Sequence, residues 1–293
     1  MNRRRFLAAS AALGAAALGA DAAWWEPRSL EVTRHRLPVP PGHPPLRFVQ
    51  ITDLHLRGIG SLHRRVAAET ARARPDFVLL TGDSVDRADA LPALDAFLAL
   101  LDPRVAKYAV LGNWEHWSGV SLGALADVYR RHNARLLVNE SVIHPHLGGA
   151  VTVTGVDDLA GAPDLRAALR GAEPTPVRLI LAHSPAFRDA VAAHMRPTGT
   201  PLGVPPDVDD TTLILSGHTH GGQVAFGGWA PLLPPGSGRY ARGWFRGDGA
   251  PPLYVSRGLG TSVLPVRFGS RPELAVFATA EPTPTQRDTK EPS

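Results

Sequence analysis

Five short apolar runs in this chain are each followed at once by side chains that can bind a metal ion. Helical patterns cover 61–73 and 91–101 between the first three runs, and 120–132 after them. This alternation predicts an α/β layered fold with largely parallel strands. Because the carboxyl ends of such strands meet at one edge of a sheet, the side chains that follow them are expected to converge there. The runs and the residues after them are 47–52 with Asp53 and His55, 76–81 with Asp83, 105–111 with Asn113, 177–181 with His183, and 211–215 with His218 and His220.

The remaining patterns add strands and loops to one predicted domain, 45–279. Further strands are expected at 150–154, 252–256 and 274–277. Residues 196–210 contain too much Pro and Gly for a helix or a central strand and are expected to form a surface loop. A second predicted loop, 225–238, is unusually apolar. The polar, Pro-containing residues 281–293 are expected to be a disordered tail.

The chain has no cysteine among its 293 residues. This excludes disulfides, thiolate zinc sites, iron–sulfur clusters and a cysteine nucleophile. Any metal ion must therefore be held by nitrogen and oxygen ligands. The formal net charge of +4 points to an anionic partner only if the basic residues lie on the folded domain.

Residues 1–22 have the features of an export signal. A basic start precedes a short run rich in Ala and Gly, and a small-residue cleavage site ends at Ala22. The pair Arg3-Arg4 followed by Phe6-Leu7 is typical of the twin-arginine type. Without this segment 28 basic and 26 acidic residues remain, so half of the basic excess belongs to the export segment and the nearly neutral remainder argues against nucleic-acid binding. The sequence leaves open whether the segment is cleaved or kept as an anchor.

The ordered metal-binding motifs resemble the signature of the calcineurin-like metallophosphoesterases. That signature reads D-x-H, G-D-x-x-D, G-N-[H]-[E/D], a lone His and G-H-x-H, and all five blocks occur here in this order, with one departure in the third. The runs 217–223 and 253–262 look like the exported bacterial branch that includes YkuE-type phosphoesterases. That branch is similar to a UDP-2,3-diacylglucosamine pyrophosphatase of lipid A biosynthesis. The resemblance covers 45–279 and implies a four-layer α/β/β/α sandwich with mixed sheets flanked by helices.

The resemblance also implies a centre with two divalent metal ions. Imidazole-rich ligation favours Mn, Fe or Zn. Asp83 would bridge the two ions, and a bridging carboxylate suits the separation of about 3.5–4 Å that favours in-line displacement at phosphorus. The other ligands would be Asp53, His55 and His220 for the first metal, and Asn113, His183 and His218 for the second.

The departure in the third block concerns the catalytic acid. Trp114 stands where the family usually has a His that stabilises the transition state or protonates the leaving oxygen. His116, three residues after Asn113, is the candidate to replace it. The alternative is a leaving group, such as that of a pyrophosphate or activated diester, that needs no acid. Trp114 and Arg257 are candidates for substrate binding, and an ion pair elsewhere is the alternative for Arg257. Glu115 is expected either to orient a ligand His or to be solvated.

Other residues receive structural interpretations. Asp86 is expected to pair with Arg87 or to cap the following turn. The apolar loop around Trp229 is either core filler or an exposed rim that would suit an acyl chain or a membrane surface. The histidines outside the motifs are not expected to be ligands; they are His35, His43, His63, His132, His144, His146 and His194.

The predicted function is hydrolysis of a phosphodiester or pyrophosphate bond by a metal-bridged hydroxide. The substrate is expected to be an envelope or lipid-linked compound such as UDP-2,3-diacylglucosamine. The expected partners are the twin-arginine translocase during export and, peripherally, a membrane, and the expected location is the periplasm or cell envelope. A nuclease of the same superfamily is one alternative, against which the near-neutral charge and the export signal argue. A catalytically weak metal- or ligand-binding module is the other, and Trp114 keeps it open.

Overall fold

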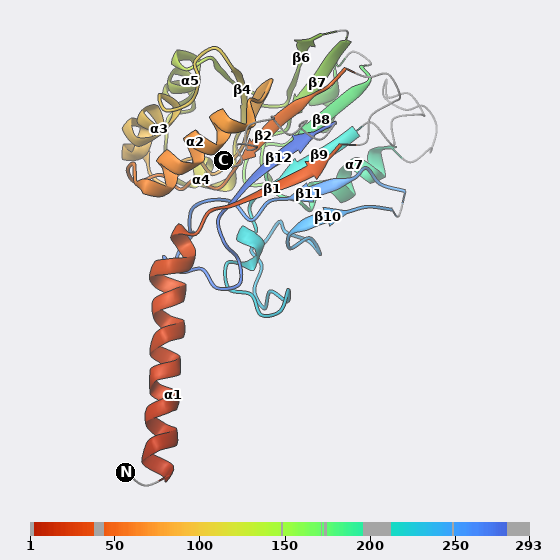
Figure 1. The fold of residues 1–293 in the computed structure, drawn as a ribbon. Helices are drawn as coiled ribbons and strands as arrows, with labels where there is room; N and C mark the ends of the chain where they lie inside the picture. The colour runs from red at the N-terminus through yellow and green to blue at the C-terminus, as the bar shows by residue number, and fades with distance from the viewer. Residues whose placement is uncertain are drawn as a thin grey trace, which may run out of the picture.

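Two six-stranded sheets lie face to face, with helices on their outer sides, in the computed structural model of this chain (Figure 1). The predicted α/β class and the four-layer arrangement are therefore confirmed. The predicted loop 196–210 and the predicted tail 281–293 lie outside the described residues. The structure describes residues 3–37, 44–147, 149–170, 172, 175–195, 212–247 and 249–279.

The first sheet has the strand order β1-β12-β2-β3-β4-β5. Its strands are β1 Glu31–Arg36, β12 Glu273–Ala278, β2 Arg47–Ile51, β3 Phe77–Thr81, β4 Ala106–Val110 and β5 Ala134–Leu136. The strands β2 to β5 are parallel neighbours, and β12 runs antiparallel to β2. The sheet is mixed, and its parallel part places the ends of β2, β3 and β4 at one edge.

The second sheet has the strand order β10-β11-β9-β8-β7-β6. Its strands are β10 Gly243–Phe245, β11 Leu253–Val255, β9 Thr212–Ser216, β8 Val177–Leu181, β7 Gly149–Gly155 and β6 Glu140–His146. The four central strands are parallel, whereas β6 and β10 are antiparallel edges. The ends of β8 and β9 thus lie together in the same way as those of the first sheet.

Alternation along the strands divides the apolar side chains between two layers. In β2, Phe48 packs between the sheets with Phe77 of β3, whereas Val49 packs on the outer face. In β8, Leu179 faces the inner core and Ile180 the outer one. Successive strand residues point to opposite faces, so a strand covered on both faces reads as a continuous apolar run. This is why the sequence showed these strands clearly.

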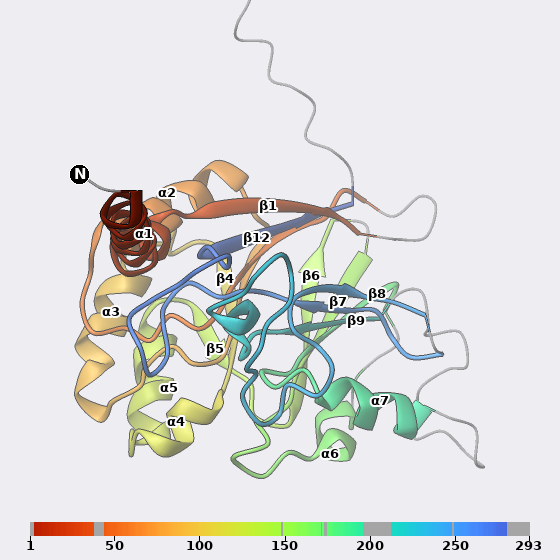
Figure 2. The same cartoon turned by 90° about the horizontal axis from the view of Figure 1, so that it is seen from below.

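Helices cover the outer face of each sheet (Figure 2). On the first sheet lie α2 Ser61–Ala73, α3 Leu91–Leu98 and α5 Leu122–Arg131, close to the predicted helices. On the second lie α6 Leu165–Leu169 and α7 Phe187–Met195. The short helix α4 Asn113–Trp117 follows β4 directly.

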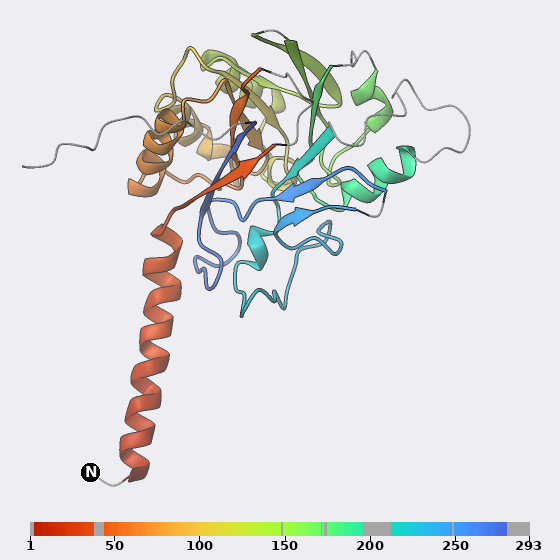
Figure 3. The same ribbon diagram turned by 45° about the vertical axis from the view of Figure 1, so that its right-hand side comes forward.

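The helix α1 Arg3–Ala20 extends away from the body of the molecule (Figure 3). It continues through the short turns η1 Asp21–Trp25 and η2 Glu26–Arg28 into β1. Among the residues described, no helix combines the length and the apolar character that a membrane crossing requires. The loops after β9 and β11 lie on the same side of the body as α1 (Figures 1 and 3).

Candidate metal centre

The seven predicted metal ligands all lie at the carboxyl ends of β2, β3, β4, β8 and β9, or in the turns that follow. Five of them adopt a positive φ, a backbone conformation that non-glycine residues rarely adopt. They are Asp53, His55, Asp83, His218 and His220. Such strain persists only where the surrounding structure imposes it, and it clusters at functional sites. The backbone here is shaped to turn these side chains toward one point.

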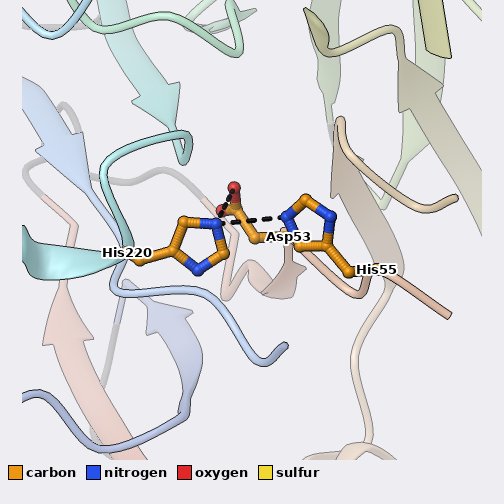
Figure 4. A group of neighbouring side chains, drawn as sticks. All are labelled: Asp53, His55 and His220. Carbon is orange, nitrogen blue, oxygen red and sulfur yellow. Dashed lines mark hydrogen bonds and ion pairs between the residues drawn. The ribbon is translucent and has the colours of Figure 1, made fainter. Parts of the chain in front are cut away.

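Asp53, His55 and His220 form the first metal group (Figure 4). Their candidate ligand atoms all lie within 4.8 Å of one another, and all three residues are buried. The Nε2 atoms of His55 and His220 are 3.1 Å apart, and His220 Nε2 lies 3.5 Å from Asp53 Oδ1. Burial lowers the pKa of both His55 and His220. Neutral imidazole is the form that binds a metal ion.

Asp83, His183 and His218 form the second metal group, again with ligand atoms within 4.8 Å. Asn113 joins it, because its Oδ1 lies 2.8 Å from His218 Nδ1 and 3.2 Å from His183 Nε2. Asp83 Oδ2 lies 3.1 Å from His183 Nε2 and 3.6 Å from His55 Nε2. Asp83 therefore contacts both groups, as a bridging ligand must.

Hydrogen bonds to backbone carbonyls fix the imidazoles of the second group. His183 Nδ1 donates to the carbonyl of Thr81 at 2.8 Å, and His218 Nε2 donates to that of Pro235 at 2.7 Å. Each ring then turns its other nitrogen toward Asn113. Such outer hydrogen bonds set the tautomer and orientation of metal-binding histidines. The converging atoms are nitrogen and oxygen acceptors, so this donor set fits a divalent transition metal.

The charges of the centre are strongly coupled. Burial raises the pKa of Asp53 to about 7, and the nearby Asp83 adds to that shift. Burial would also raise the pKa of Asp83, but the charge and hydrogen bond of His183, together with His55 and the backbone N–H of Trp114, outweigh it and hold this pKa well below its usual range. Conversely, Asp83 raises the pKa of His183 well above its usual value in spite of burial. A proton on His183 thus compensates Asp83, and a cation bound by the same atoms would take over that role.

Glycines in the motifs leave room for these carboxylates. A Cβ on Gly112 would collide with the carboxylate of Asp83, and a Cβ on Gly217 with that of Asp53. A glycine precedes the motif residues for this steric reason. The pairs Gly112-Asn113 and Gly217-His218 therefore indicate close packing around the carboxylates.

Glu115 positions the turn that carries Asp83. Its carboxylate is buried and accepts backbone N–H groups from Asp83 at 3.0 Å, Ser84 at 2.7 Å and Gly112 at 2.8 Å. Of the two interpretations that the sequence left open, solvation is wrong. Glu115 orients a ligand, although that ligand is an aspartate rather than a histidine.

Replacing Glu115 by Gln is expected to weaken metal binding by about 10–100-fold, the usual cost of losing a group that orients a ligand. The new amide would turn an NH2 group toward N–H donors that need an acceptor. Titration of the metal-stripped protein with Mn²⁺ measures the change. Glu140→Gln, at an exposed ion pair with Arg135, is the matched control. Equal Mn²⁺ affinity in the two variants would contradict the positioning role.

Three further predicted site residues have partners of their own. His116 Nε2 lies 2.7 Å from Asp157 Oδ1, a partner the sequence did not suggest. The Trp114 indole meets the ring of His55 edge to face at 6.0 Å. Arg257 pairs with Glu31 at 3.0 Å and also with Glu273, which is the ion-pair alternative. The catalytic role of His116 and the substrate-binding roles of Trp114 and Arg257 stay predictions.

The residues that received structural interpretations lie outside the two metal groups. Asp86 pairs with Arg57 at 2.8 Å, so the expected pairing with Arg87 is wrong; Arg87 pairs with Asp89 instead. No histidine outside the motifs belongs to either group in the part of the chain that the structure describes. His43 and the side chain of His194 fall outside that part.

Two residues at the first metal group were not predicted from the sequence. Arg267 Nη2 lies 3.2 Å from His220 Nδ1, and Ser270 Oγ donates to the carbonyl of His220 at 2.6 Å. They lie in the loop between β11 and β12, outside every motif. No sequence signal distinguishes them, because their role depends on which loops the fold brings together.

Comparisons with known proteins show which family this chain is similar to. A sequence model of the calcineurin-like phosphoesterase family matches residues 46–222. The chain is 29% identical to the uncharacterized metallophosphoesterase YkuE of Bacillus subtilis, over 94% of this chain and 97% of that protein. It is 30% identical to a Bos taurus transmembrane protein with a metallophosphoesterase domain, over 84% of this chain and 55% of that protein. A 5'-nucleotidase precursor from Thermus thermophilus aligns in structure with a TM-score of 0.45 and 16% identity, over 80% of this chain and 54% of that one.

Proposed function

Because this chain belongs to the calcineurin-like phosphoesterase family and is a metal-dependent phosphoesterase, we propose that it hydrolyses a phosphodiester or pyrophosphate bond in a lipid-linked substrate of the cell envelope. The reaction is carried by one observation, the position of Asp83 between the two metal groups. When bound, two divalent ions would polarise the phosphoryl oxygens and make water a stronger nucleophile.

The ligands of the chain set the charge that the phosphate meets. Among the residues that the structure describes, Asp53 and Asp83 alone contribute carboxylates to the two groups, while Asn113 offers a neutral amide oxygen. Two divalent cations would therefore leave a net positive charge at the centre. That charge attracts an anionic phosphate and stabilises the negative charge that develops in the transition state.

His116 is proposed to deliver the proton to the leaving oxygen. It lies one helical turn after Asn113 in α4, and its Nε2 is held by Asp157. The carboxylate of Asp157 is itself fixed by the backbone N–H groups of Asp158 and Ala162. Asp158 in turn accepts a hydrogen bond from Ser184, next to the ligand His183. These contacts support the proposal that the His116–Asp157 pair acts near the second metal group.

The lipid-linked character of the substrate is proposed from an apolar rim. We define this rim as the exposed side chains Phe226, Trp229, Leu232, Val263 and Leu264. Trp229 is 67% exposed and Leu232 is 81% exposed, which rules out the interpretation of these side chains of the 225–238 loop as core filler.

The rim lies next to the metal centre. Pro235, in the same loop as Trp229 and Leu232, accepts the hydrogen bond of the ligand His218. Gln223 joins the two loops of the rim, because its Nε2 donates to the carbonyl of Leu264 at 2.9 Å. Exposed apolar side chains that surround a site indicate an apolar partner. An acyl chain of the substrate, or the surface of a membrane that holds it, would cover them.

The place of action is proposed from the N-terminal residues. The twin-arginine pattern supports export through the twin-arginine translocase to the periplasm or cell envelope. UDP-2,3-diacylglucosamine, a pyrophosphate with two acyl chains, represents the proposed substrate class. Once residues 1–22 are left out, the net charge of the chain is close to zero, which gives no support for a nuclease.

Replacing Trp229 and Leu232 together by Ser is expected to lower kcat/KM for UDP-2,3-diacylglucosamine by about 10²–10⁴-fold, since each covered apolar side chain is worth about 1.5–3 kcal/mol and a factor of ten corresponds to about 1.4 kcal/mol. Hydrolysis of bis(p-nitrophenyl) phosphate, which has no acyl chain, should not change. Steady-state kinetics with both substrates measure the effect. A wild-type enzyme that cleaves the aryl diester but not the acylated substrate would contradict the proposed substrate class. Equal losses on both substrates would contradict the role of the rim.

A further inference from the structure

Arg267 is a buried arginine at the back of the first metal group. Its guanidinium donates to three backbone carbonyls, those of Ser270 at 2.8 Å, Gly260 at 2.9 Å and Arg257 at 2.9 Å. The fourth contact is His220 Nδ1, 3.2 Å from Nη2. Five N–H donors in a rigid plane can hold several acceptors at fixed positions at once. The guanidinium thus holds the His220 ring with its Nε2 facing Asp53 and His55.

Arg267 also supports a second ligand through one intermediate. Gly260, whose carbonyl Arg267 holds, donates its N–H to the carbonyl of Asp53 at 2.6 Å. The neighbouring Gly258 packs directly against the carboxylate of Asp53. One side chain therefore fixes His220 directly and the backbone of Asp53 indirectly.

The segment after α1 holds the loop that carries Arg267. Glu26 is buried, and its carboxylate accepts the N–H groups of Ser270 at 2.6 Å and Gly269 at 3.0 Å. The carbonyl of Ala22 accepts the N–H of Arg267 itself at 2.9 Å. A buried carboxylate that accepts backbone N–H groups is a strong constraint on a loop. This loop is therefore clamped from the N-terminal side.

The two metal groups differ in this support. The rings of the second group are held by the carbonyls of Thr81 and Pro235, neither of which belongs to the clamped loop. Its bridging ligand Asp83 is held by Glu115. A disturbance at Arg267 or Glu26 should therefore reach the first group and spare the second.

We propose that Arg267 is the positioning residue of the first metal group and that Glu26 secures it, so that docking of the N-terminal segment controls metal occupancy at that group alone. This inference rests on the proposed function. It adds a connection between the N-terminal segment and the first metal group. The contact between the segment and the loop would have to persist after any processing of the N-terminus. Cleavage after Ala22, as predicted, would remove the contact of the Ala22 carbonyl. It would leave Glu26 and its contacts in the chain.

The test uses the full chain loaded with Mn²⁺, in wild-type form and as Arg267→Lys and Glu26→Gln. Bound Mn per chain is measured by elemental analysis, and the arrangement of the ions by electron paramagnetic resonance. Two adjacent Mn²⁺ ions give a spin-coupled spectrum, whereas a single ion gives an isolated six-line signal. Arg104→Lys and Glu69→Gln, both at exposed ion pairs, are the matched controls. Circular dichroism establishes that each variant is folded.

Wild type and the controls should hold two coupled Mn²⁺ ions. Arg267→Lys and Glu26→Gln should each keep one ion, which gives the isolated spectrum. Their affinity for the other ion should fall by about 10–100-fold. Glu26→Gln is the milder change and keeps the test available if Arg267→Lys does not fold. Two coupled ions of unchanged affinity in a folded variant would overturn the inference, as would equal loss of both ions. A wild-type chain that binds no Mn²⁺ would instead overturn the proposed metal-dependent function.

Discussion

Replacing Asp83 by Ala is expected to lower hydrolysis of bis(p-nitrophenyl) phosphate by about 10³-fold or more. Asp83 contacts both metal groups, so its loss should remove both ions together with several kcal/mol of transition-state stabilisation, at a factor of ten per 1.4 kcal/mol. No other carboxylate in the described residues belongs to the second group. Initial rates with saturating Mn²⁺ and the metal content of the purified variant measure the effect.

The control for Asp83 is Asp89→Ala, which removes an exposed carboxylate in the same part of the chain. Its activity and metal content should match those of wild type. Circular dichroism must show that the Asp83 variant is folded, because burial makes any change at this position a risk to stability. A folded Asp83→Ala variant that retains hydrolysis would defeat the assignment of the centre.

His218→Ala and His220→Ala are expected to remove different metal ions although the two residues are neighbours in one motif. His218 belongs to the second group and His220 to the first. Each variant should retain about one ion and lose about 10²–10³-fold in kcat, since in-line displacement needs both ions of the pair. Metal content and kinetics measure the two effects separately.

Both variants are expected to lose the metal pair in the same way. In each, the coupled spectrum of the Mn²⁺ pair should give way to that of a single ion, and higher Mn²⁺ concentration should restore little activity. His63→Ala, outside both groups, should behave as wild type. Loss of both ions in His218→Ala, with His220→Ala unaffected, would contradict the allocation of ligands.

The parts of the fold that could be predicted from the sequence are those buried on both faces. The runs at 47–52, 76–81 and 177–181 became β2, β3 and β8, because a strand covered on both sides is apolar throughout. The edge strands were missed. β1 reads Glu-Val-Thr-Arg-His-Arg and is only partly buried, and β6 contains a proline, so neither shows the apolar run of a buried strand.

The metal ligands could be predicted because each lies in a short motif at the end of a strand. Parallel strand order explains why the ends of β2, β3 and β4 lie together in one sheet and those of β8 and β9 in the other. The expectation of a single edge was wrong, because each metal group combines residues from both sheets and depends on how the two sheets pack. Glu115 had two open interpretations because a carboxylate beside a motif can be buried or solvated, and only packing decides. Arg267 and Glu26 could not be predicted, because their roles arise from contacts between residues far apart in the chain.

The central claim is that this chain holds two metal ions around Asp83 and hydrolyses phosphate esters with them. The most direct measurement strips the purified protein with a chelator, titrates it with Mn²⁺ and follows bound metal and hydrolysis of bis(p-nitrophenyl) phosphate in the same samples. The account predicts no hydrolysis in the stripped protein, binding that saturates at two ions per chain, and activity that appears as the second ion binds. Hydrolysis that survives complete removal of metal, or saturation without any hydrolysis, would contradict it.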